Sequence, residues 1–238
     1  MGELLLCSGA EVKRVENTIV RLGRAYGACR MDVFAITSSI VVTMSFEDGQ
    51  EVTQTRRIQN PGRTDLDRLE KLNSLSRECC EKRMEIEKFR EKFLQIKEEP
   101  VSSVQFYGGS MLGTAAFTVF FGGTLYDAAA AACFAVFVCF LQRKLSPRCP
   151  NTIIFNLLTS LIIGTGIYGV AGVLPFLQVD KVLIGDIMLL IPGIALTNAV
   201  KDMLVGDTIA GAMRFLESLT WAGALAAGFM AVIWMMGG

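Results

Sequence analysis

The sequence predicts an α-helical integral membrane protein with five transmembrane helices, preceded by a small α+β domain in the cytoplasm. The first observation is the distribution of charge: residues 1–100 hold 34 of the 46 charged side chains, and residues 101–238 hold only 12. The second is that residues 101–238 contain several apolar segments, each close in length to the span of about 20 residues that a helix needs to cross the hydrocarbon core. The third is that apolar residues in 1–100 alternate with polar ones at the spacings of amphipathic helices and strands. We therefore expect a domain boundary near residue 100.

Residues 3–26 predict one amphipathic helix. Apolar side chains recur there every three or four positions, at Val12, Val15, Ile19, Leu22 and Tyr26. This spacing places them on one stripe, with the charged residues largely elsewhere.

The next segment has the composition of β-strands. Val, Ile, Thr and Phe are frequent, and Asp48-Gly49 is a strong hairpin signal between residues 39–46 and 50–58. We expect an antiparallel sheet of two or three strands, ended by Asn60-Pro61-Gly62.

A long helix is expected after the sheet, with Thr64 as its N-cap. Apolar residues follow a heptad pattern from Leu72 to Ile96, which Lys82 interrupts, and Glu98-Glu99-Pro100 should end the helix. Packing of this helix on the sheet is favoured over a coiled-coil oligomer. The result is an α-β-β-(β)-α domain of residues 1–100.

Residues 101–238 predict the transmembrane domain. The expected spans are about 104–121, 124–141, 152–172, 182–200 and 209–236. The loop between the second and third spans contains Arg143, Lys144 and Arg148, so the positive-inside rule places it in the cytoplasm. The N-terminal domain then lies inside and the C-terminus outside.

Pro192-Gly193 interrupts the fourth expected span near the middle of the bilayer. Proline lacks an N–H and its ring clashes with the preceding turn. Broken helices at this depth hold the substrate or the coupling ion in many transporters. An ordinary structural kink is the alternative. The candidates for a substrate or ion pathway are Pro192, Gly193, Thr197, Asn198, Asp202, Asp186 and Asp127.

A second polar group follows the break and forms a candidate cytoplasmic gate or anchor. It consists of Lys201, Asp207, Arg214 and Glu217. Arg214 and Glu217 are spaced as an i,i+3 ion pair. Because residues 218–236 alone are long enough to span, we expect this pair at the cytoplasmic interface.

Several function classes find no support. The chain has no histidine, which excludes a Ser-His-Asp triad and a histidine-ligated metal, and its seven cysteines form no CxxC motif. No phosphate-binding loop, basic stripe or nucleophile–base pairing is recognisable. We expect no enzyme, no cofactor, no metal and no nucleic-acid partner.

Three blocks carry a family resemblance: "CSGAEVKRVENTIVRLGRAYGA", "ITSSIVVTM" and "LIPGIALTNAVKDMLVGDTIAGAMRFLES". Together with a soluble domain before five spans, they resemble the threonine/serine exporter family of bacterial membrane proteins. Full-length members contain a second set of about five spans. The resemblance therefore implies that this chain is the larger half of a split system. The chain would assemble with a separate small membrane subunit, with further copies of itself, or with both.

The resemblance implies secondary export of a small polar metabolite across the bacterial inner membrane, without ATP and coupled to protons. A threonine- or serine-type amino acid is the first candidate substrate, and a succinate-like dicarboxylate is the alternative because split members are associated with it. In this reading Pro192 and Gly193 shape the site, Thr197 and Asn198 offer hydrogen bonds, and Asp202 or Asp186 titrates. A membrane-anchored sensor or scaffold and a passive channel are the other classes that remain open.

Overall fold

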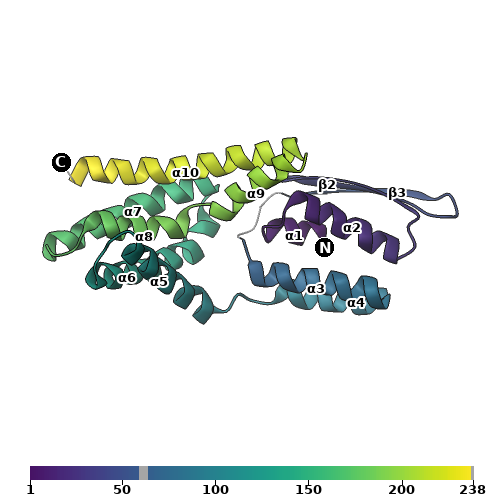
Figure 1. Cartoon of the computed structure of the whole chain (residues 1–238), viewed down its shortest axis with the longest axis horizontal. Helices are drawn as coiled ribbons and strands as arrows, with labels where there is room; N and C mark the ends of the chain where they lie inside the picture. The colour runs from purple at the N-terminus through teal and green to yellow at the C-terminus, as the bar shows by residue number, and fades with distance from the viewer. Residues whose placement is uncertain (59–63, 237–238) are drawn as a thin grey trace. The chain divides into compact units, whose positions relative to one another are not determined.

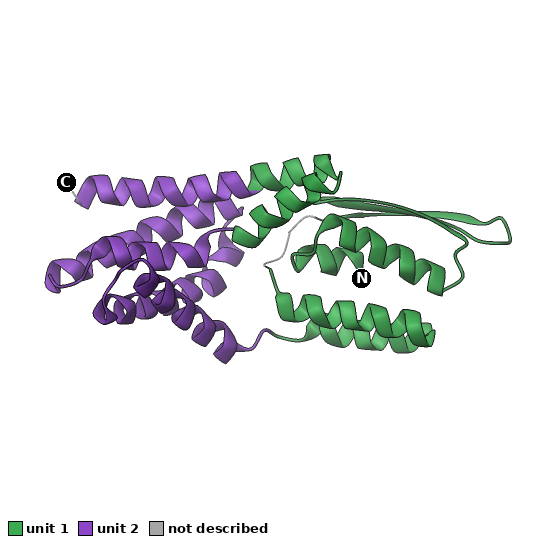
Figure 2. Ribbon diagram, viewed as in Figure 1, with its two compact units in different colours: residues 1–100, 193–217 green, residues 101–192, 218–238 purple. Residues whose placement is uncertain are grey.

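The computed structural model describes residues 1–58 and 64–236, and its contacts divide the chain into two compact units. Unit 1 contains Met1–Pro100 together with Gly193–Glu217, and unit 2 contains Val101–Pro192 with Ser218–Gly238 (Figure 2). A segment from the apolar part of the sequence thus belongs to the same compact unit as the charged N-terminal part.

Unit 1 begins with two helices, α1 (Gly2–Cys7) and α2 (Val12–Ala25), where the sequence predicted one. The single helix over 3–26 is wrong because the chain turns at Gly9, which has a φ of +95°. The N–H groups of Gly9 and Ala10 donate to the carbonyls of Leu6 and Leu5, which closes the end of α1. We call residues 8–11 the α1–α2 turn.

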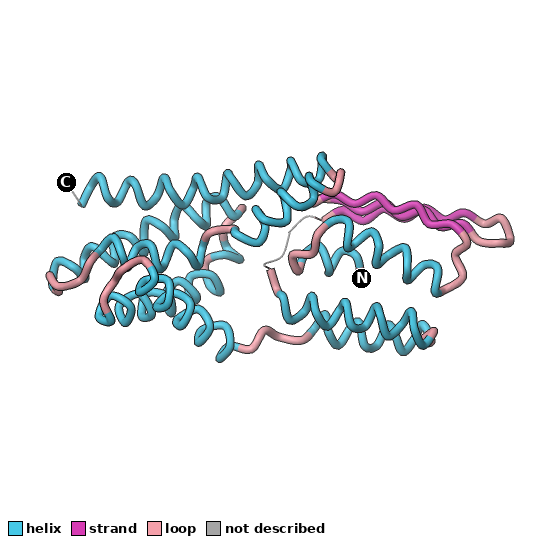
Figure 3. The backbone as a smooth tube through the Cα atoms, viewed as in Figure 1, coloured by secondary structure: helices cyan, strands magenta, loops and turns pink. Residues whose placement is uncertain are grey.

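A three-stranded antiparallel sheet follows, drawn in magenta in Figure 3. Its strand order is β1 (Arg30–Ile36), β2 (Ser39–Ser45), β3 (Glu51–Arg57). The predicted hairpin at Asp48-Gly49 is confirmed, and Gly49 supplies a φ of +82°. The predicted end of the sheet at Asn60-Pro61-Gly62 lies outside the described residues.

Two helices, α3 (Leu66–Lys82) and α4 (Ile86–Glu98), replace the single long helix expected from the heptads (Figure 1). The expectation is wrong because Arg83 adopts the left-handed conformation, with a φ of 44°, and ends α3. Asp65, rather than Thr64, is the N-cap, and its side chain accepts a hydrogen bond from the Arg68 N–H. The predicted end of the second helix at Glu98 is confirmed.

The rest of unit 1 is α9 (Gly193–Leu204) and the first third of α10 (Thr208–Met236). Gly206, with a φ of +98°, allows the turn between the two helices. Ala210 of α10 is buried in the same hydrophobic cluster as Leu5, Val12 and Leu72. This packing brings the start of α10 against the start of α2.

Unit 2 is helical in its described part. It contains α5 (Ser103–Phe120), α6 (Leu125–Lys144), the short 3₁₀ helix η1 (Ser146–Arg148), α7 (Thr152–Val173), α8 (Val179–Leu190) and the remainder of α10. Its core includes Val138, Ile163, Val182 and Phe229, from α6, α7, α8 and α10. Large apolar side chains also face outward from these helices, as expected for contact with lipid.

Three described helices are long and apolar enough to cross a membrane: Leu125–Arg148, Thr152–Val173 and Thr208–Met236. The interrupted pair α8 and α9 supplies a fourth if it counts as one span. The five expected spans are therefore not confirmed. The first of them corresponds to α5, a helix whose Ser, Gln, Gly and Thr residues lower its mean hydropathy.

Candidate functional site

The predicted interruption of the fourth span is present. Helix α8 ends at Leu190 and α9 begins at Gly193, so Pro192 lies between them. The missing N–H of proline explains why no helix continues through this position. On α9 the Thr197 hydroxyl donates to the Gly193 carbonyl at 2.9 Å, so it satisfies backbone next to the break.

The polar residues after the break converge on the α1–α2 turn, within unit 1. The Asn198 side-chain amide donates to the Gly9 carbonyl at 2.8 Å. The Arg214 guanidinium donates to the Ala10 carbonyl at 3.2 Å. Both acceptors are backbone carbonyls of the α1–α2 turn, which belong to neither helix and need hydrogen-bond donors from elsewhere.

Asp202 occupies the start of α2. One carboxylate oxygen accepts a hydrogen bond from the Val12 N–H at 3.2 Å, and the other lies 3.1 Å from an Arg214 nitrogen. Glu11, the N-cap of α2, makes no side-chain capping bond. Asp202 therefore caps α2 from 190 residues away, and the N-terminal dipole of that helix favours its negative charge.

This ion pair is buried. Asp202 is 1% exposed and Arg214 is 8% exposed. By contrast, Lys201 contacts Glu11 at 2.7 Å in an exposed pair, which contributes little to stability. We call Asn198, Lys201, Asp202 and Arg214, with residues 9–12, the polar junction.

The other two members of the candidate gate are Asp207 and Glu217. Asp207 follows the junction, and one of its carboxylate oxygens is buried without a hydrogen-bond partner among the described residues. Its charge acts on Glu16 of α2, a carboxyl that accepts a hydrogen bond from the Ala35 N–H. Burial raises the pKa of Glu16. The structure pairs Arg214 with Asp202, and the expected pair with Glu217 stays a prediction.

Asp186 is the most unusual carboxyl of unit 2. It lies on α8, is 0% exposed, and neither of its oxygens has a hydrogen-bond partner in the described part of the chain. At the preceding residue, Gly185, α8 approaches α5 closely, since an added Cβ would meet the Thr118 hydroxyl at 2.1 Å. On α7, Thr159 is also fully buried with an unpartnered hydroxyl. Unit 2 thus encloses polar groups that its own described residues leave unsatisfied.

Asp127 is equally buried, but both of its carboxylate oxygens accept hydrogen bonds. One of its oxygens accepts from the Gln178 N–H at 2.8 Å, and the other accepts from the N–H and hydroxyl of Thr124, both at 2.7 Å. With Thr124 it forms a capping box at the start of α6. Its contacts are those of a structural cap, and its assignment to a pathway stays a prediction.

Sequence reasoning missed the partners of the polar junction. Gly9, Ala10 and Val12 contribute backbone groups, which carry no side-chain signal, and they lie 189 to 204 positions from their partners. The capping role of Asp127 did have a local signal, because Thr124 and Asp127 have the spacing of a capping box. Among the residues that the structure describes, no group of three or more Cys, Asp or Glu side chains is placed to hold a metal ion.

Comparisons with known proteins identify a family and one relative. Residues 1–236 match a family described as "Putative threonine/serine exporter". The chain is 28% identical over 215 residues to a protein of Klebsiella aerogenes named "Probable succinate transporter subunit YjjP", and the match covers 89% of this chain and 81% of that protein. No solved structure matches the chain.

Proposed function

Because the chain belongs to the threonine/serine exporter family, we propose that it is a subunit of a secondary transporter that exports a small carboxylate-bearing metabolite and couples this export to protons. The first substrate candidate is a threonine- or serine-type amino acid. We place the N-terminal domain in the cytoplasm of a bacterial cell, the C-terminus outside, and α8 and α9 together across the inner membrane.

The observation that carries proton coupling is the isolation of Asp186. An ionised carboxylate at this buried position would lack the hydrogen bonds that normally compensate for lost hydration. Ionisable groups inside membrane spans commonly form part of proton or ion pathways. Asp202 is the weaker candidate for this role, because Val12 and Arg214 already engage both of its oxygens.

The break at Pro192 supports the substrate class. The first N–H groups of α9, from Gly193 onward, have no intrahelical acceptors and carry a partial positive charge. A carboxylate is the substrate group that such a helix start favours. Both threonine and succinate carry this group.

A succinate-like dicarboxylate is the second candidate substrate, favoured by the name of the Klebsiella relative. That name also contains the word subunit, which supports assembly with a second membrane protein, with further copies of this chain, or with both. Assembly would bury part of the outward-facing apolar surface of unit 2.

Counterflow in proteoliposomes tests the substrate. Vesicles containing the purified chain are loaded separately with threonine, serine or succinate, and uptake of the same labelled compound is followed. Saturable uptake with one preload identifies the substrate and excludes a passive pore. Absence of counterflow, both for the chain alone and for the complex purified with its native membrane partners, would contradict transport and favour a membrane-anchored sensor.

The Asp186→Asn variant tests the coupling. We expect export driven by a proton gradient to be lost while exchange of substrate across the membrane continues, because exchange requires no net proton movement. Asp180→Asn is the matched control, since Asp180 lies on the same helix in an exposed contact with Lys181. Full proton-driven export by Asp186→Asn would remove Asp186 from the mechanism.

A further inference from the structure

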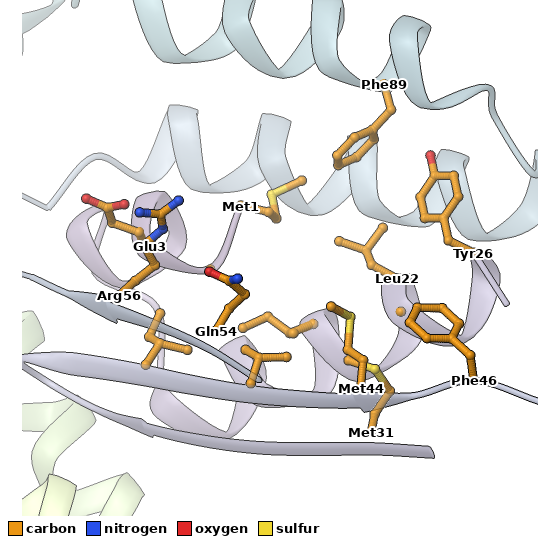
Figure 4. Close-up of a pocket in the computed structure, with 15 residues that line it drawn as sticks. Met1, Glu3, Leu22, Tyr26, Met31, Met44, Phe46, Gln54, Arg56 and Phe89 are labelled. Carbon is orange, nitrogen blue, oxygen red and sulfur yellow. The ribbon is translucent and has the colours of Figure 1, made fainter. Parts of the chain in front are cut away.

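Unit 1 contains an apolar cavity of about 550 Å³ that the proposed transport function does not use. The floor is one face of the sheet, with Ile40, Val42 and Met44 of β2. Leu22 of α2 and Phe89 of α4 form walls (Figure 4). Its size is within the range of small-molecule sites.

The apolar lining is adaptable. Met31 and Met44 are cross-strand partners, and both line the cavity. Methionine side chains are flexible and polarizable, so they adjust to ligands of different shape. The Tyr26 hydroxyl donates to the Met84 carbonyl at 3.0 Å and accepts from the Cys79 thiol at 3.1 Å, so its polar end is already satisfied. What Tyr26 offers to a ligand is therefore its ring.

One end of the cavity is polar. Glu3 and Arg56 both lie at this end, with Gln54 near them (Figure 4). The sheet register directs Gln54 and Arg56 to the cavity face, because they are the cross-strand partners of Val42 and Ile40. Among the described residues Arg56 forms no ion pair, so its guanidinium is available to an anion.

We propose that this cavity binds a free amino acid with a large apolar side chain, such as leucine, methionine or phenylalanine. The Arg56 guanidinium would bind the α-carboxylate, the Glu3 carboxylate would bind the α-ammonium, and the side chain would enter the apolar part. This arrangement matches one positive and one negative side chain of the cavity lining with the two charges of the ligand. A fatty acid fits less well, because its single negative head group would lie near Glu3.

Helix α2 connects this cavity to the polar junction inside unit 1. Its first residue, Val12, donates to Asp202, while Ile19 and Leu22 line the cavity further along. A ligand that fixes α2 therefore acts on the helix that Asp202 caps. The amino acid would be a regulatory ligand, distinct from the transported metabolite.

The test is equilibrium binding of tritiated leucine, methionine and phenylalanine to the full chain in lipid nanodiscs. We expect saturable binding that Arg56→Gln and Glu3→Gln each weaken by about tenfold or more, since each removes a charge-assisted contact. Arg57→Gln is the matched control, because Arg57 is the next residue on β3 and its partner Ser39 is on the opposite face of β2 from Ile40. Its binding should equal that of the unmodified chain.

Two further arms separate the alternatives. The Asp186→Asn variant should bind these amino acids normally, which distinguishes the cavity from the transport pathway. Loss of binding in Asp186→Asn but not in Arg56→Gln would overturn the proposal. Competition by 4-methylpentanoate, which is leucine without its ammonium group, should be at least about tenfold weaker than by leucine. Equal competition, or no binding of any of the three amino acids, would also overturn it.

Discussion

Asp202 contributes two interactions, an ion pair and a helix cap, from one buried side chain. Replacing it by asparagine removes the carboxylate that pairs with the buried Arg214 guanidinium. Breaking a buried pair in this way costs about 3–5 kcal/mol of unfolding free energy. We expect Asp202→Asn to lower stability by an amount in that range, measured by denaturant unfolding in detergent micelles.

The control for this prediction is Lys201→Ala, on the same helix. Its pair with Glu11 is exposed, so the loss should be below about 1 kcal/mol. The double variant Asp202→Asn, Arg214→Gln should be more stable than the sum of the two single losses implies, because both single variants lose the same ion pair. Strictly additive losses would show that the pair is not coupled.

Glu16 gives the N-terminal part of the chain a specific pH dependence. Burial raises its pKa above the ordinary value of 4.5, and the hydrogen bond from Ala35 only partly opposes this effect. The folded state therefore holds the proton more tightly than the unfolded state. The associated stabilisation is complete below pH 4.5 and is lost as the pH rises through the raised pKa.

We expect Glu16→Gln to remove this component of the stability profile, so that stability between pH 4 and 7 falls less steeply with pH than in the unmodified chain. Glu87→Gln, at an exposed position of α4, should leave the profile unchanged. Unfolding midpoints measured across this range check the prediction. An unchanged slope in Glu16→Gln would contradict it.

At the scale of elements, the contact between α5 and α8 depends on a missing side chain. An added Cβ at Gly185 would lie 2.1 Å from the Thr118 hydroxyl oxygen and 3.1 Å from the Thr114 carbonyl. Because the second of these groups is backbone, side-chain rotation alone cannot make room. We expect Gly185→Ala to destabilise the protein by about 1–3 kcal/mol, the typical cost of overpacking.

Gly169→Ala is the matched control, because that helical glycine has no neighbour within 4 Å of an added Cβ. It should be neutral or stabilising by up to about 1 kcal/mol, since alanine is the better helix former. Adding Thr118→Ala to Gly185→Ala should recover part of the loss. Equal effects of the two glycine variants would show that α5 and α8 do not meet as closely as described.

The elements also show how far sequence reasoning extends. The hairpin at Asp48-Gly49 and the break at Pro192 were predictable, because each depends on a residue with a local conformational constraint. The turn at Gly9 was missed because the apolar stripe that predicted the helix, from Val12 to Tyr26, lies wholly after Gly9 and carries no information on the residues before it. The turn at Arg83 had only an indirect signal, the interruption of the heptads at Lys82, since arginine has no preference for a left-handed conformation.

In the candidate site, too, some features could be predicted from sequence and others could not. Asp186, Asn198 and Asp202 could be selected from sequence, because polar residues are rare in apolar segments. Their partners could not be selected. Asp202 contacts a backbone N–H of α2, and Asp186 has no hydrogen-bond partner among the described residues; both facts depend on tertiary packing, which no local pattern encodes.

For the whole molecule, the side of the membrane on which each loop lies shows whether α5 crosses the bilayer. If α5 and α6 both cross, the N-terminal domain and the η1 loop lie on the same side; if α6 alone crosses, they lie on opposite sides. The basic residues Arg143, Lys144 and Arg148 favour a cytoplasmic η1 loop. We expect both regions in the cytoplasm, and therefore α5 in the membrane despite its lower hydropathy.

Single cysteines at Asp48 and Ser146, introduced in a variant without the native cysteines, check this arrangement. A membrane-impermeant maleimide should label neither position in intact cells and both positions in inverted vesicles, while a cysteine at Gln178, before α8, should show the reverse pattern. Labelling of Asp48 and Ser146 from opposite sides would place α5 outside the bilayer. The protein would then have four spans, counting α8 and α9 as one, and its N-terminal domain would lie on the other side of the membrane from the η1 loop.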